Sequence, residues 1–174
     1  PAISGKQLDA NWAAGGSAGM RNSAAGIANT TYHLYAVRTA ASATADIYAH
    51  TSTTVSTVLT AFQAETGGSS YVYARRIGSI IRASNAIILF IQVGDTFIRK
   101  TPVQTVSNTS DHSSAQTQAA DVPTGIVVEA ILRVDMTGSA AGQTLDVFPV
   151  DGTAGTGIGI VTSIGSGPLS RAEV

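Results

Sequence analysis

The histidines and acidic residues are the side chains that could act as metal ligands or as acids and bases. Asp46 and His50 are four positions apart in a segment whose composition favours a strand. Four strand residues span about 13 Å, which is too far for two side chains to act together. His33 lies among tyrosines, and His112 follows Asp111 in a polar stretch. We therefore expect surface or structural roles for the histidines; a metal held by histidines from three subunits is the alternative.

Other catalytic motifs are weak or absent. The stretch from Asp151 to Gly159, DGTAGTGIG, resembles a phosphate loop but lacks the Gly-Lys-Ser/Thr ending and the framing strand and helix. No Gly-x-Ser-x-Gly elbow occurs. Asp135 and Asp146 could form a carboxylate pair of the kind that cleaves glycosidic bonds, but the pattern favours ordinary acids at strand ends. With no cysteine in the chain, thiolate sites are excluded. We predict no enzyme activity, no metal and no cofactor.

A basic cluster is more informative. Within 26 positions lie Arg75, Arg76, Arg82, Arg99 and Lys100, with Asp95 the only acid among them. Because neighbouring strand residues point to opposite faces, Arg75 or Arg76 must point inward or toward an interface. Such a guanidinium favours a carboxylate, which it binds through two hydrogen bonds. We predict interface or structural pairing; charge protection of a sheet edge and ligand binding are the alternatives.

The run from Ala86 to Val93, AIILFIQV, is apolar at seven of its eight positions. A strand with one face in water alternates apolar and polar residues, so both faces of this strand are expected to be covered. In a small antiparallel domain the second cover is often another subunit. The predicted subunit interface comprises Arg75, Arg76, Ile87, Ile88, Leu89, Phe90 and Ile91.

Five tyrosines and Trp12 could stack on sugar rings, although such side chains more often anchor cores and interfaces. We select Tyr35, Tyr48 and Tyr73 as candidate glycan contacts. The polar stretch from Val106 to Ala120 is a candidate binding loop at one end of the fold.

Composition indicates a weakly charged, hydroxyl-rich surface. Ala, Ser, Thr and Gly provide 84 of the 174 residues, and 12% are charged, about half the usual share. The net charge of −1 disfavours a nucleic-acid partner, which normally requires a basic patch. The longest apolar stretch is shorter than the roughly 18 residues of a membrane helix, so membrane insertion is not expected.

Short β segments separated by Gly and Pro turns recur through the chain, at residues 30–38, 43–50, 71–82, 85–93, 96–100 (TFIRK), 126–134, 144–150 and 157–164. Gly94-Asp95 predicts a two-residue hairpin turn. Residues 4–12, with Ser4 as a cap, are predicted to start a short helix, and residues 51–70 to form a long connection. About eight or nine strands predict an all-β fold, an antiparallel β-sandwich of the jelly-roll type. The predicted organisation is a loop-rich N-terminal arm (1–29), a β-sandwich domain (30–165) and a C-terminal tail (166–174).

The segments GKQLDANWAAGG and GIANTTYHLYAVR are followed by YVYARRIGSIIR, by Gly-Asp and Lys-Thr-Pro, and by VPTGIVVEAILRV. In this order they resemble the C-terminal domain of tailed-bacteriophage virion proteins, particularly tail fibres and spikes, from Gly5 to about Ile164. The resemblance implies a β-sandwich that assembles into homotrimers at the virion surface, without enzyme activity. It implies no receptor site at the level of residues. The expected partners are other virion proteins and host cell-surface polysaccharide; a head-fibre, decoration or connector module without a receptor is the alternative.

Overall fold

The computed structural model describes residues 3–40, 44–94, 96–101, 117 and 122–128, and the backbone of strands at 133–138, 144–145, 161–162 and 167–173. This part of the chain is mostly β, as predicted. Its elements are β1 (Gln7–Asn11), β2 (Gly19–Arg21), β3 (Thr31–Thr39), β4 (Ala45–His50), α1 (Val55–Gln63), β5 (Tyr71–Ala83), β6 (Ala86–Ile87), β7 (Phe90–Val93), β8 (Thr96–Arg99), β9 (Arg133–Gly138), β10 (Thr144–Leu145), β11 (Val161–Thr162) and β12 (Gly167–Glu173).

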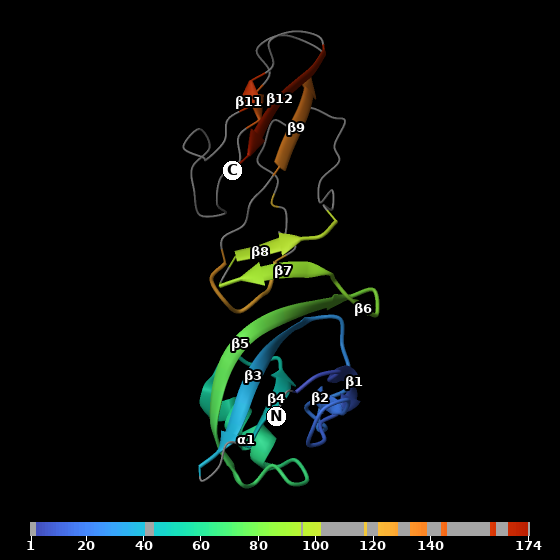
Figure 1. The fold of residues 1–174 in the computed structure, drawn as a ribbon. Coiled ribbons are helices and arrows are strands. Elements are labelled where there is room, and N and C mark those ends of the chain that lie inside the picture. The colour runs from blue at the N-terminus through green and yellow to red at the C-terminus, as the bar shows by residue number, and fades with distance from the viewer. Residues whose placement is uncertain are drawn as a thin grey trace.

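Six strands form one curled sheet in the order β1-β2-β4-β3-β5-β6 (Figure 1). The strands β4, β3, β5 and β6 pair antiparallel, as predicted. β1 pairs parallel to β2, and β2 parallel to β4. The prediction of a purely antiparallel arrangement is therefore wrong for the first two strands, and the sheet is mixed.

The predicted N-terminal arm contributes β1 and β2 to this sheet, and residues 4–12 include a strand where we predicted the start of a helix. Long-range contacts hold the segment extended. Lys6 Nζ lies 2.8 Å from Asp46 Oδ1, and both side chains are buried. Trp12 packs edge-on against Phe62, with ring centroids 4.6 Å apart. These contacts override the local signal of the Ser4 cap.

Helix α1 occupies residues for which we predicted a connection without helix. Val58 and Phe62, one helical turn apart, are fully buried, and the helix packs against β5 (Figure 1). The Thr- and Val-rich sequence of this helix favours a strand. Two apolar residues one turn apart are a weak signal for a helix. The helix forms because it covers one face of the sheet.

The alternation along β3 separates two apolar cores, as predicted for residues 30–38. Tyr35 and Val37 belong to the core beneath α1, together with Trp12, Tyr48, Val58, Phe62 and Tyr71. Tyr32 and Leu34 pack on the opposite face with Leu8, Met20 and Ala49. The sheet is therefore covered on one face by the helix and, over part of the other, by the N-terminal residues.

The remaining strands form three two-stranded sheets: β7 with β8, β9 with β12, and β10 with β11. The predicted strand at residues 85–93 is divided into β6 and β7. Most of the predicted C-terminal tail forms β12, which pairs antiparallel to β9 at the end of the molecule opposite α1 (Figure 1). The candidate loop from Val106 to Ala120, apart from Thr117, and the glycine-rich stretch from Asp151 to Gly159 lie outside the described residues.

Candidate assembly surface

The hairpin of β7 and β8 follows directly from the Gly94-Asp95 dipeptide. Val93 pairs with Thr96, which leaves these two residues as the connection, and Phe90 pairs with Arg99 at the other end. Gly94 has a φ of 61°, in the left-handed region that glycine adopts without strain. The predicted two-residue turn is confirmed.

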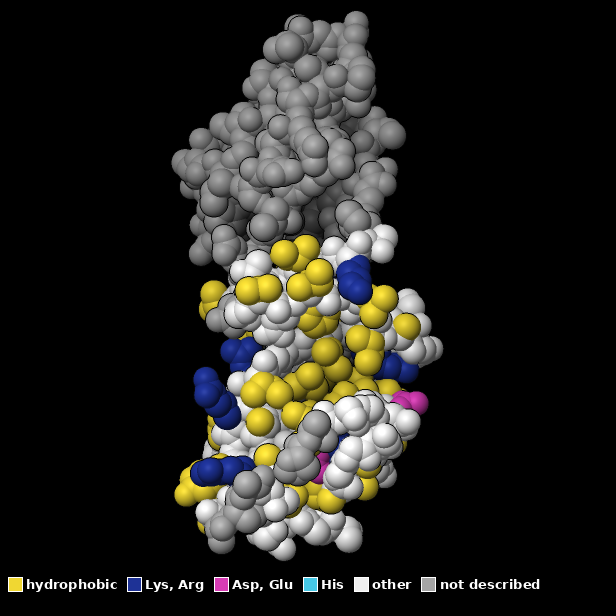
Figure 2. Space-filling model, in the orientation of Figure 1, with side chains coloured by type: hydrophobic (Ala, Val, Ile, Leu, Met, Phe, Trp, Pro, Cys, Tyr) yellow, Lys and Arg dark blue, Asp and Glu magenta, His cyan; other side chains and the backbone are white. Residues whose placement is uncertain are grey.

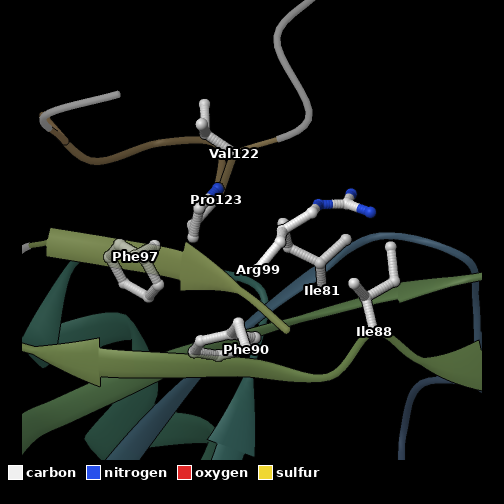
Figure 3. A pocket seen from close by; sticks show the side chains of 7 residues that line it. All are labelled: Ile81, Ile88, Phe90, Phe97, Arg99, Val122 and Pro123. Atoms are coloured by element: carbon white, nitrogen blue, oxygen red, sulfur yellow. The ribbon is translucent and has the colours of Figure 1, made fainter. Parts of the chain in front are cut away.

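The inner face of the hairpin packs toward the six-stranded sheet. The rings of Phe90 and Phe97 lie 5.3 Å apart, and with Ile81, Ile88 and Pro123 they line a small apolar hollow (Figure 3). The rest of the lining comes from Arg99 and Val122. This hollow is small and lined mainly by apolar side chains that pack the hairpin against β5, so we assign it to the core and not to a ligand.

Gly78 allows the hairpin to approach β5 closely. A Cβ at this position would lie 2.9 Å from Oε1 of Gln92, and the same oxygen lies 3.4 Å from the backbone nitrogen of Ser79, which donates to it. The Gln92 amide also donates to the carbonyl of Gly94, at 2.7 Å. Gln92, the single polar residue of the apolar run, thus hydrogen-bonds the inner face of the hairpin to the sheet.

The outer hairpin face comprises Leu89, Ile91, Val93 and Ile98, with Ile91 paired directly to Ile98. These side chains keep 67%, 50%, 67% and 48% of their surface exposed. Ile87 on the neighbouring β6 is exposed as well. Figure 2 shows hydrophobic side chains at the surface at the level of β7 and β8. An outward strand face normally carries polar residues, so this face is the main candidate for a contact outside the chain.

The predicted interface residues divide between the two faces of this segment. Leu89 and Ile91 lie on the outer hairpin face, whereas Ile88 and Phe90 line the inner hollow. Within the described residues the chain covers only the inner face, and the predicted cover of the outer face by another subunit stays a prediction. Sequence reasoning missed Val93 and Ile98, although the alternation within TFIRK and the hairpin register indicate Ile98.

The predicted arginines also divide. The register pairs Arg75 with Ala36 and Arg76 with Tyr35, so the two guanidinium groups leave the sheet on opposite faces, as their adjacency predicted. Arg76 is on the side of α1 and Arg75 is exposed on the other. Both arginines lie on β5, so neither belongs to the outer hairpin face.

Two of the three candidate glycan contacts are ruled out. Tyr35 and Tyr48 have no exposed surface on which a sugar could stack. Their hydroxyl groups donate to the Ser52 carbonyl at 2.9 Å and to the Glu65 carboxylate at 3.0 Å. Both are core anchors, and of the three predicted contacts only Tyr73 is exposed.

The histidines of the described sheet have structural partners. His33 Nδ1 lies 2.8 Å from Ser79 Oγ in a buried contact, and His50 Nδ1 accepts from the backbone of Ser52 at 2.9 Å. Burial lowers the pKa of His33 below 6.5, helped by the positive charge of Arg76 and by His50. Burial alone lowers the pKa of His50. The neutral imidazoles therefore act as fixed polar groups of the core.

Within the part of the chain that the structure describes, no three His, Cys, Asp or Glu side chains come together in a way that could hold a metal ion. His112 and Asp146, and the side chain of Asp135, lie outside the described residues. No described helix is long and apolar enough to cross a bilayer.

Comparison with known proteins gave no match to a family model, to a curated protein or to a solved structure.

Proposed function

We propose that this chain is a non-enzymatic structural domain of a bacteriophage particle, part of a fibre or spike exposed on the virion, that assembles with copies of itself into a homotrimer. The placement on a phage particle rests on the resemblance of the segments between Gly5 and Ile164. The self-assembly rests on one observation: the outer hairpin face is apolar and exposed.

The free energy available from this face supports association. Fully burying a Val, Leu or Ile side chain contributes about 1.5–3 kcal/mol. Since the four side chains keep roughly half to two thirds of their surface exposed, covering them contributes roughly 3–7 kcal/mol per copy. Two such faces supply roughly 6–14 kcal/mol, which is comparable with the cost of association of about 4–15 kcal/mol. The face is therefore sufficient for weak association, and tight assembly requires further contacts.

A second copy of the chain suits this face better than a charged partner. The centre of the outer hairpin face has no ionisable side chain, since Ile91, Val93 and Ile98 are joined only by Thr96 on the same side of the ladder. Lys100, just beyond β8, donates its backbone N–H to the Leu89 carbonyl at 3.2 Å and is exposed at the margin of this face. Three copies can bring the centres of these faces together around a threefold axis, with the Lys100 side chains at the margin, so that no unpaired charge is buried. β8 has β7 as its one partner among the described strands.

Light scattering coupled to size exclusion tests the assembly. We expect a species of three times the chain mass of 17.7 kDa, whose fraction rises with protein concentration. Replacing Ile91 and Ile98 by threonine keeps the β-branched shape and should lower that fraction. Val72→Thr, at an exposed position on β5, is the matched control and should leave it unchanged. A monomer at all concentrations refutes the assembly.

The position on the particle needs a separate test. Antibodies raised against the isolated domain should label intact particles of the virus that encodes it. Labelling confined to disrupted particles refutes exposure on the virion surface.

A purely architectural head-fibre, decoration or connector module is the second candidate. The burial of Tyr35 and Tyr48 favours it, because it removes two of the three aromatic side chains that could have held a host glycan. If the assembled protein binds no host-surface polysaccharide, the result supports this second candidate.

The finer topology, an antiparallel jelly-roll sandwich, is also part of the proposal. The antiparallel run of β4, β3, β5 and β6 supports it, whereas the parallel pairs of β1 and β2 are additions at one edge of the sheet.

A further inference from the structure

A second uncovered surface lies on the six-stranded sheet, on the face opposite α1. β3 and β5 pair Ala36 with Arg75 and Arg38 with Tyr73, and paired residues of an antiparallel ladder share a face. The intervening Val37 packs into the core beneath the helix. The four side chains of the two flanking pairs therefore point away from the helix.

Two positive charges and an aromatic ring meet on this surface. The guanidinium carbon of Arg38 lies 4.9 Å from the centroid of the Tyr73 ring, over its face. Arg75 is the diagonal neighbour of Arg38 across the ladder, at a backbone separation of about 7–8 Å. Side chains as long as arginine can converge over this distance on one carboxylate or on two adjacent ones.

The described acids do not neutralise the pair. Asp46 is buried in its ion pair with Lys6, and Glu65 is buried and accepts from the Tyr48 hydroxyl. Asp9 is exposed on β1, which β2 and β4 separate from β3 in the sheet. Within residues 3–40, 44–94, 96–101, 117 and 122–128, neither Arg38 nor Arg75 forms an ion pair. The two exposed guanidinium groups are thus available to an anion from outside.

Small side chains form a floor beside the two arginines. β4 continues the same face, with Ala45 paired to Arg38 and Ile47 paired to Ala36. Ala45 is exposed, and Ala36 is half-buried. The N-terminal residues cover this face only around Leu34, Ile47 and Ile80, so the floor is open at the Ala45 end.

We propose that this patch, formed by Arg38, Tyr73 and Arg75 with the floor at Ala36 and Ala45, binds an acidic polysaccharide through the carboxylates of its sugar rings. The guanidinium fork matches a carboxylate with two parallel hydrogen bonds. The alanine floor and the exposed part of the Tyr73 ring contact the apolar face of a pyranose ring. This inference deepens the receptor-binding part of the proposed function and rests on it.

The patch lies on the face of the sheet and not along a strand edge, which favours a polysaccharide over an acidic peptide. An extended peptide gains its affinity by adding a strand at a sheet edge, whereas the side chains of the patch stand on the face formed by β3 and β5. β3 is paired on both sides, with β4 and with β5, and β5 pairs with β6 only at Arg82 and Ala83. Recognition on this face therefore depends on side chains. An open site binds weakly, and repeated sugar units meeting several assembled copies offset that weakness.

The test is calorimetric titration of the full chain with polygalacturonate, with neutral dextran and poly-L-glutamate as comparison polymers. We expect binding to polygalacturonate that weakens with salt, because the contacts are charged, and no binding to dextran. Arg75→Gln should lower the affinity at least fivefold and Tyr73→Ala about threefold. Lys100→Gln, which removes one charge from another exposed position, should change it less than twofold.

Three results overturn the inference: no binding to polygalacturonate at low salt, equal losses for Arg75→Gln and Lys100→Gln, or equally tight binding of poly-L-glutamate. Light scattering on the same samples separates this inference from self-assembly. An assembled protein that does not bind refutes the polysaccharide site alone, and a monomer that binds refutes the assembly alone.

Discussion

Replacing Ile88 and Leu89 by aspartate, one at a time, separates the inner face of the hairpin from its outer face. The two residues are neighbours in the sequence, and each change introduces the same charge. Ile88 lines the apolar hollow with Ile81 and Phe90, whereas Leu89 is 67% exposed. The structure therefore predicts opposite consequences for folding and for assembly.

Leu89→Asp should lower the stability of the single chain only slightly. One third of the side chain is buried, so the lost burial amounts to roughly 0.5–1 kcal/mol. In an assembled protein the carboxylate would be taken out of water without a partner, which costs several kcal/mol. We expect a folded protein whose unfolding temperature changes by about 2 °C and whose assembly is weakened at least 100-fold.

Ile88→Asp should instead lower the free energy of unfolding of the single chain. The lost apolar burial and the partial desolvation of the new carboxylate together cost about 3 kcal/mol. For a chain of this size each kcal/mol lowers the unfolding temperature by about 2–4 °C, so we expect a decrease of about 6–12 °C.

Thermal unfolding and light scattering on each variant provide the assay, with Ser69→Asp, in an exposed turn, as the control for added charge. If Leu89→Asp keeps the assembled mass, the outer hairpin face is not the contact between copies. If Ile88→Asp unfolds at the temperature of the unmodified protein, the assignment of the inner face is wrong.

Three further predictions concern the fold. Lys6→Met leaves the Asp46 carboxylate buried without its cation and should lower the free energy of unfolding by about 3 kcal/mol, as measured by chemical denaturation. The control Lys100→Met should leave the free energy of unfolding unchanged, and equal losses for the two variants would contradict the buried pair. Gly19→Ala would force a Cβ into the carbonyl of Asn11 and should lower stability by at least about 2 kcal/mol, whereas Gly26→Ala, with open space around it, should not. Because the folded pKa values of His33 and His50 lie below 6.5, the unfolded chain binds more protons below that pH, so stability should fall as pH decreases from about 7 toward 5; an unchanged unfolding temperature over this range would contradict their burial.

Much of the central sheet could be predicted from local pattern. The alternation along residues 30–38 and the Gly94-Asp95 dipeptide specify a strand and a turn through neighbours in the sequence, and both are confirmed. The helix could not be predicted with the same ease. Its Thr- and Val-rich sequence favours a strand. Val58 and Phe62 stabilise the helix only through their burial against the sheet, a contact that the local sequence does not reveal.

The candidate sites show the same division. Exposed and buried tyrosines look alike in the sequence, and Tyr48 differs from Tyr73 only through distant residues such as Phe62, whose ring centroid lies 4.7 Å from that of Tyr48. The apolar run predicted a surface in need of cover, but its division into two faces depends on Gly78 and on the docking of Gln92. Contacts across long sequence separations decided these outcomes.

The buried Lys6–Asp46 ion pair has a consequence for chemical labelling. The chain has only two lysines, and the side chain of Lys6 is 6% exposed, whereas Lys100 is exposed at the end of β8. Of the two lysines, amine-reactive reagents will therefore modify Lys100 first, beside the outer hairpin face, where a fluorophore reports on contact between copies. Modification of Lys6 requires its ion pair to open, so the slow labelling of that residue measures how often the N-terminal strands detach.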